Sequence, residues 1–140
     1  MTTRWIQGAV EILTVGLPFC AFKLVTGLIA LDTAFAPLGY ALLALGTVDL
    51  VFNALNLVAL VAAHRRLTGA CLAELVLRGR HDLALALDVF LSFSLVAAVV
   101  GLGLIVRIPA WAMPIWNFAV VLNVLGAGIG RLFSAVRRPA

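Results

Sequence analysis

Four long runs of apolar residues dominate this sequence, and each is bounded by charged residues or by proline. A helix needs about 20 mainly apolar residues to cross roughly 30 Å of hydrocarbon, and all four runs reach that length. The runs are continuous rather than alternating, and four strands could not close a membrane barrel, so they predict helices. We therefore expect transmembrane helices at residues 8–30, 38–63, 83–106 and 114–136.

Composition supports the same fold class. Of 140 residues, 64% are hydrophobic and only 11% are charged, whereas a soluble domain carries about 25% charged residues. The polar surface is too small for an exterior in water, and the apolar content excludes disorder. The first run contains Glu11 and Lys23 and lacks a small-residue cleavage site, so we interpret it as a retained helix rather than a signal peptide. We predict one all-α domain over residues 1–140, a four-helix transmembrane bundle.

The positions of the basic residues predict the orientation, because short loops rich in Lys and Arg stay in the cytoplasm. Basic residues precede the first run, occupy the middle connection and follow the last run: Arg4, then Arg65, Arg66, Arg78 and Arg80, then Arg137 and Arg138. The other two connections together hold one arginine, Arg107. Both termini and the middle connection should therefore be cytoplasmic in a multi-pass protein of a bacterial-type inner or plasma membrane. An outer aromatic belt of Tyr40, Trp111 and Trp116 is expected, with Trp5 on the inner side.

The middle connection is too long for a simple turn, and it carries Leu67, Cys71, Leu72 and Leu75 at helical spacing. This pattern predicts a short interfacial helix whose flanking arginines contact anionic lipid headgroups, at about 1 kcal/mol per basic residue. A docking surface for a partner protein is the alternative interpretation. Because the basic residues lie at the ends of apolar runs, they indicate membrane topology, and no nucleic-acid partner is expected.

A polar stripe runs along the second predicted helix. Gly46, Asp49, Asn53 and Asn56 are spaced three, four and three residues apart, which places them on one helical face. At about 1.5 Å per residue, Lys23 and Asp49 lie roughly 10 and 16 Å below the outer boundary, within reach of a lysine side chain. The sequence therefore predicts a Lys23–Asp49 ion pair. It leaves open whether the pair only fixes the packing or whether Asp49 binds a proton or cation under the control of Lys23.

A second group of polar residues is expected nearer the cytoplasm. Glu11, Asp88 and Arg131 have similar estimated depths, within about 10 Å of the inner boundary, and the sequence favours an Asp88–Arg131 pair that leaves Glu11 spare. On the fourth predicted helix, Asn123 lies near Gly126 and Gly130. These two glycines have the GxxxG spacing that permits close helix packing, either within the chain or between copies.

No catalytic, metal or cofactor pattern is present in the sequence. His64 and His81 lie at the membrane edge, whereas axial haem ligands usually come from within helices that face a shared cavity. Cys20 and Cys71 lie too far apart along the predicted topology to meet, and they form no CxxC motif. We therefore expect neither an enzyme nor a bound metal or cofactor.

Two functions remain open on these grounds, and transport is the preferred interpretation. The first is an oligomeric transporter or channel that moves a proton, cation or small polar solute past Asp49, Asn53 and Asn56, with Glu11 as a further candidate. The second is a non-catalytic accessory or scaffolding subunit of a larger membrane complex, in which the same stripe and the glycines form helix contacts. A permeation path would leave unpaired, hydrated carboxylates, whereas a scaffold would pair nearly all of them.

Overall fold

The computed structural model describes residues 3–136 apart from 66, 68–71, 73–75 and 78–79, and it describes only the backbone at 3–4, 81–82, 85, 127 and 130–136. The described residues form four long helical segments, with no strand among them. This agrees with the predicted all-α class.

The first segment contains three consecutive elements, α1 (Thr3–Glu11), the π-helix η1 (Ile12–Gly16) and α2 (Leu17–Leu31). The π-helix ends two residues before Pro18. Proline has no N–H to donate to the carbonyl four residues earlier, and its ring crowds that carbonyl, so a local change of helical pitch is expected there. The chain stays helical through this point, and the predicted span of 8–30 lies inside the segment.

The second segment is α3 (Ala36–Ala63), with Pro37 in its first turn, where a missing N–H removes no helical hydrogen bond. It ends at His64, which adopts a left-handed conformation with φ 54° and donates its N–H to the carbonyl of Leu60. Both ends lie close to the predicted span of 38–63.

The third segment, α5 (His81–Gly101), ends earlier than the predicted span of 83–106. Gly103 is in the left-handed region with φ 67°, which stops the helix, and the short 3-10 helix η2 (Leu104–Arg107) follows. The fourth segment is α6 (Met113–Val136), which agrees with the predicted 114–136.

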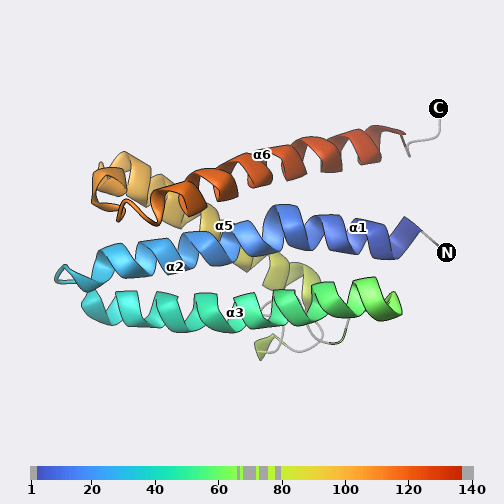
Figure 1. Cartoon of the computed structure of the whole chain (residues 1–140), viewed down its shortest axis with the longest axis horizontal. Coiled ribbons are helices and arrows are strands. Elements are labelled where there is room, and N and C mark those ends of the chain that lie inside the picture. Colours follow the sequence, from blue (N-terminus) through green and yellow to red (C-terminus); the bar gives the residue numbers. More distant parts are fainter. Residues whose placement is uncertain (1–2, 66, 68–71, 73–75, 78–79, 137–140) are drawn as a thin grey trace.

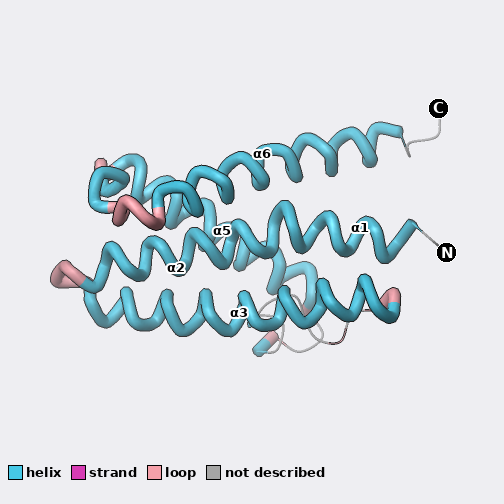
Figure 2. Tube along the Cα trace, in the orientation of Figure 1, coloured by secondary structure: helices cyan, strands magenta, loops and turns pink. Residues whose placement is uncertain are grey.

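Helix α2 is at the centre of the bundle. It lies between α3 and α6, and α5 crosses the bundle obliquely against it (Figure 1). The chain begins and ends at the same end of the bundle, and the turns that join α2 to α3 and α5 to α6 lie at the opposite end (Figures 1 and 2).

An aromatic core fills the half of the bundle nearest those turns. Phe22 packs edge-on against Trp116 with ring centroids 5.1 Å apart, and Phe19 packs edge-on against Phe93 at 5.7 Å. Trp116 is only 2% exposed, so its assignment to an outer aromatic belt is wrong: the ring joins α6 to α2. Trp111 and Tyr40 are exposed.

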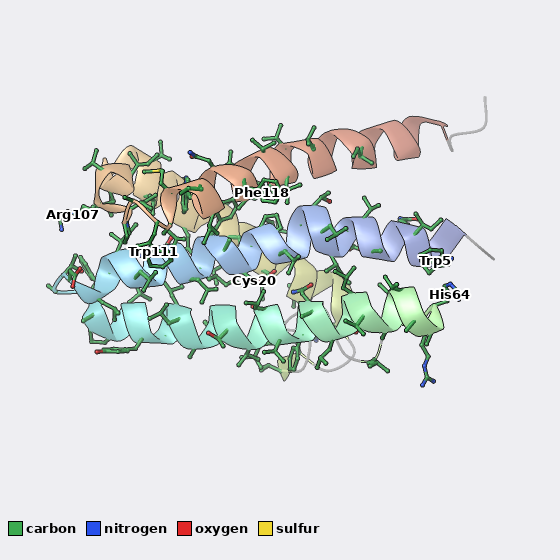
Figure 3. All side chains as sticks on the ribbon, in the orientation of Figure 1. Trp5, Cys20, His64, Arg107, Trp111 and Phe118 are labelled. Atoms are coloured by element: carbon green, nitrogen blue, oxygen red, sulfur yellow. The ribbon has the colours of Figure 1, made fainter. Side chains whose placement is uncertain are left out.

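The exterior of the bundle is apolar. Large hydrophobic side chains such as Phe90, Val106, Phe118 and Val124 are more than half exposed, and Figure 3 shows Phe118 and Trp111 among the side chains on the ribbon. Within the described residues, two helices are long and apolar enough to cross a membrane, Trp5–Leu31 and Ala36–Ala63, and α5 and α6 contain shorter apolar stretches, Ala86–Gly101 and Met113–Gly126.

Candidate functional site

The polar stripe of α3 faces α2 and η1 at Gly46, Asp49 and Asn53. Its buried residues recur every three or four positions: Gly39, Leu42, Gly46, Asp49, Asn53 and Asn56. On α2 and η1 the facing residues repeat in the same way: Gly16, Cys20, Lys23 and Gly27. A spacing of 3.5 residues keeps two such faces in register, and small residues let the helix backbones approach closely.

Two glycines set this close approach. A Cβ added at Gly39 would lie 2.8 Å from the carbonyl oxygen of Gly27, and one added at Gly27 would lie 3.0 Å from the carbonyl oxygen of Gly39. Because both obstacles are backbone atoms, a side chain at either position would push α2 and α3 apart.

Lys23 lies at the centre of a buried ion cluster that joins three helices. Its Nζ donates to Asp49 Oδ2 of α3 at 2.6 Å and also to Asp88 Oδ1 of α5. The exposed fraction of the side chain is 2% for Lys23, 4% for Asp49 and 13% for Asp88. An ionised group costs much free energy to bury without a partner, so this cluster fixes the mutual positions of α2, α3 and α5.

The middle connection returns to the same stripe. The backbone N–H of Leu72 donates to Asp49 Oδ1 at 2.7 Å, and the N–H of Leu67 donates to Asn56 Oδ1 at 2.9 Å. Asp49 therefore accepts from both Lys23 and the connection, and Asn56 is fully buried. At Leu67 and Leu72 the connection is held by its main chain against α3.

Asn53 lies between these contacts. Its Nδ2 donates to the carbonyl oxygen of Asp49 at 2.9 Å and to Cys20 Sγ at 3.7 Å, and Cys20 lies between α2 and α3 (Figure 3). A Cβ added at Gly16 would collide with the Asn53 side chain. The amide therefore contacts both its own helix and the neighbouring α2 and η1.

A separate polar contact joins α6 to the π-helix. Asn123 Nδ2 donates to the carbonyl oxygen of Thr14 in a long hydrogen bond of 3.5 Å. Pro18, four residues after Thr14, has no N–H to donate to the carbonyl of Thr14. The side-chain amide of Asn123 on another helix supplies a donor there. Gly126 allows the approach, since a Cβ there would collide with the Thr14 side chain. The first glycine of the GxxxG pair therefore packs within the chain.

The predicted Lys23–Asp49 ion pair is confirmed. Asp88, for which the sequence favoured Arg131, pairs with Lys23; the side chain of Arg131 lies outside the described residues, so the Asp88–Arg131 pair stays a prediction. Asp88 would lie at the depth of Arg131 if the third helix began at the same membrane depth as the other helices. Instead, Leu67 and then Leu72 of the connection contact α3 at Asn56 and at Asp49. Glu11, the last residue of α1, is half-buried.

The basic residues of the connection are described in part. Arg65 and Arg80 are exposed, and Arg66 and Arg78 lie outside the described residues. Most of the predicted interfacial helix lies there too, but the contacts of Leu67 and Leu72 show that the connection reaches inward to the stripe and does not lie only on a surface. The His64 ring stacks near Trp5, with centroids 4.8 Å apart, at the end that carries both termini (Figure 3).

Sequence reasoning missed Cys20 and the amides of Leu67 and Leu72. Cys20 could have been found, because Gly16, Cys20, Lys23 and Gly27 repeat the three-and-four spacing of the stripe that they face. The two amides could not, since a backbone N–H carries no signal in the sequence.

The chemistry of the cluster is limited to charge and hydrogen bonding. Among the described residues, no group of three or more His, Cys, Asp or Glu side chains is placed to hold a metal ion. The cluster pairs charges and accepts a backbone donor. No protein-family model, curated protein or solved structure matches this chain.

Proposed function

We propose that this chain is a multi-pass membrane protein whose polar residues hold its helices together and that serves as a non-catalytic subunit of a larger membrane complex. The observation that carries this proposal is the inverted distribution of polarity. Lys23, Asp49, Asn53 and Asn56 are buried, whereas large apolar side chains cover the outside. Lipid is the solvent that suits such an exterior, and polar groups inside it must find partners in the protein.

The pairing of the stripe favours a scaffold over a conduit. Asp49 accepts hydrogen bonds from Lys23 and from the connection. Asn56 accepts from the connection, and Asn53 donates to a carbonyl of α3. Asn123 donates to the carbonyl of Thr14. A permeation path would require hydrated groups along its length, whereas these side chains contact one another. The exposed arginines Arg65 and Arg80 and the exposed faces of α5 and α6 are the surfaces left for anionic lipid, for another copy of the chain or for a larger partner.

A second candidate function, transport of a proton or cation, is favoured by one specific observation. The ion cluster contains two carboxylates and one ammonium group, so it can accept one more positive charge. Transport would also require a path from the cluster to both sides, which an oligomer could provide.

Two measurements test the choice. We expect the full-length chain, extracted from its native membrane in mild detergent, to co-purify with another membrane protein at a fixed ratio. We also expect vesicles that contain only the purified chain to show no proton, cation or small-solute flux above empty vesicles at either voltage polarity. Flux that Asn53→Leu abolishes while the fold is retained would overturn the subunit proposal and establish transport.

A further inference from the structure

The outward face of α3 carries an exposed apolar ridge, whose residues lie four, three and four positions apart: Val51, Leu55, Val58 and Ala62. Each of them follows by two positions a buried residue of the inward face: Asp49, Asn53, Asn56 and Leu60. A shift of two residues moves a side chain to nearly the opposite side of a helix. The outer ridge of α3, as we call these four residues, therefore faces away from α2.

The outer ridge has the length of one membrane leaflet. From Val51 to Ala62 the helix rises by about 16 Å. The hydrocarbon part of one leaflet is about 15 Å thick, which is half of the bilayer core. The ridge ends one residue before the end of α3 at Ala63. An acyl chain that lies along the ridge therefore has its headgroup at the end of α3.

Arg65 is the charged residue at this end of the ridge, and it is exposed. It follows a turn at His64, which among the described residues is the only one other than glycine with a positive φ. The N–H of His64 donates to the carbonyl of Leu60, and its ring lies 4.8 Å from the ring of Trp5 on α1 (Figure 3). A defined helix end, which α1 contacts, thus carries Arg65.

The sequence on either side of this helix end is basic. Residues 50–73 contain Arg65 and Arg66 and no acidic residue, and residues 1–10 contain Arg4 and no acidic residue. The rest of the connection has two basic and two acidic residues: Arg78, Arg80, Glu74 and Asp82. The connection as a whole therefore carries a positive charge, and basic segments next to a membrane attract anionic headgroups.

We propose that Arg65 and the outer ridge of α3 form a binding site for an anionic phospholipid. The guanidinium group of Arg65 binds the phosphate, whose oxygens match its fork of N–H donors, and the ridge contacts an acyl chain. A soluble anion would use the charge alone, whereas a phospholipid uses both the charge and a ridge of leaflet length. This inference rests on the proposed membrane location, and it assigns one lipid to a face that the subunit proposal leaves open.

Quenching of tryptophan fluorescence by lipids with brominated acyl chains tests the site in the full-length chain in vesicles. Val58→Trp places a reporter on the ridge, and Phe118→Trp on α6 is the matched control. Both native side chains are about two-thirds exposed, and each lies five residues from one end of its helix. Subtraction of the wild-type signal removes the contribution of the three native tryptophans.

We expect brominated phosphatidylglycerol to bind at the Val58→Trp reporter about fivefold more strongly than brominated phosphatidylcholine, which is the ratio for one basic residue. The preference at the Phe118→Trp reporter should be smaller. Arg65→Gln should remove the preference at the first reporter and leave the second unchanged. Arg65→Lys should retain most of it, because the positive charge is kept.

Equal preferences at the two reporters, or a preference that Arg65→Gln does not change, would overturn the site and leave the subunit proposal intact. Quenching of the Phe118→Trp reporter alone would show that protein, not lipid, covers the outer ridge, and it would also overturn the site. If neither lipid quenched either reporter, the membrane location itself would be contradicted, and with it the subunit proposal.

Discussion

Lys23 joins three helices of the bundle. It is on α2, its ammonium group contacts carboxylates of α3 and α5, and its Cβ lies close to Gly46, where an added Cβ would be 3.1 Å away. Lys23 is only 2% exposed, so its two carboxylate partners offset the cost of burying its charge. A substitution of any of the three residues therefore affects the other two.

The first prediction compares the loss of the cation with the loss of one anion. Lys23→Met leaves Asp49 and Asp88 without a cation, and removing one partner of a buried ion pair costs about 3–5 kcal/mol. Asp49→Asn should cost less, because Lys23 keeps Asp88 and the new amide oxygen can still accept from Leu72. The free energy of unfolding in mild detergent measures both.

The double variant Lys23→Met with Asp49→Asn serves as the control for this comparison. Its loss should be smaller than the sum of the two single losses, since interacting residues are not additive. Equal losses in the two single variants would show that Asp88 does not compensate Lys23.

Sequence could predict the Lys23–Asp49 contact but not the whole cluster. The two residues lie on consecutive helices, so a count of residues from their shared turn gives their relative depth. Asp88 is separated from them by the connection, whose path depends on the amides of Leu67 and Leu72. No side-chain pattern specifies that path.

Among the elements, the closest pair is α2 and α3. Glycines face each other across this contact, and the backbones meet at Gly27 and Gly39. In lipid, where the hydrophobic effect does not drive helices together, such packing is a main source of association. The ion cluster lies on the same interface, so its geometry depends on this close approach.

The second prediction uses a pair of glycines. Gly39→Ala places a methyl group 2.8 Å from a backbone oxygen, so α2 and α3 must separate, and we expect a loss of about 1–3 kcal/mol, as for other overpacked sites. Gly128→Ala on α6 is the matched control, because nothing lies within 4 Å of its added Cβ. Higher helix propensity should make that variant neutral or more stable by up to about 1 kcal/mol. Unfolding midpoints in detergent compare the two, and similar values would argue against the close α2–α3 contact.

The helix ends differ in how far the sequence determines them. Apolar runs bounded by proline or charge gave nearly correct limits for α3 and α6. The apolar run of the third helix continues past Gly101 without a charge until Arg107, so hydropathy overestimates its length. The left-handed Gly103 ends it, and glycine alone does not predict that conformation.

At the scale of the whole molecule, the proposed topology places both chain ends and the middle connection on the cytoplasmic side. The structure places the two ends of the chain at one end of the bundle (Figure 1). Under the proposed topology, the basic residues predict that this end faces the cytoplasm.

The third prediction is a labelling pattern. With Cys20→Ala and Cys71→Ser as background, a cysteine at Arg65 should react with a membrane-impermeant reagent only from the cytoplasmic side, and a cysteine at Asp32 only from the outside. Both positions are exposed, so accessibility does not limit the reaction. The reverse pattern would show that the bundle is inserted in the opposite orientation.

The contacts between polar groups also imply an order of events during synthesis. The Lys23–Asp49 bond spans 26 residues, the Lys23–Asp88 bond 65, and the Asn123–Thr14 bond 109. As the chain leaves the ribosome, Lys23 can therefore pair with Asp49 as soon as α3 has been synthesised. The contact between Asn123 and the Thr14 carbonyl can form only when α6 has been synthesised, after the two bonds of Lys23 have become possible.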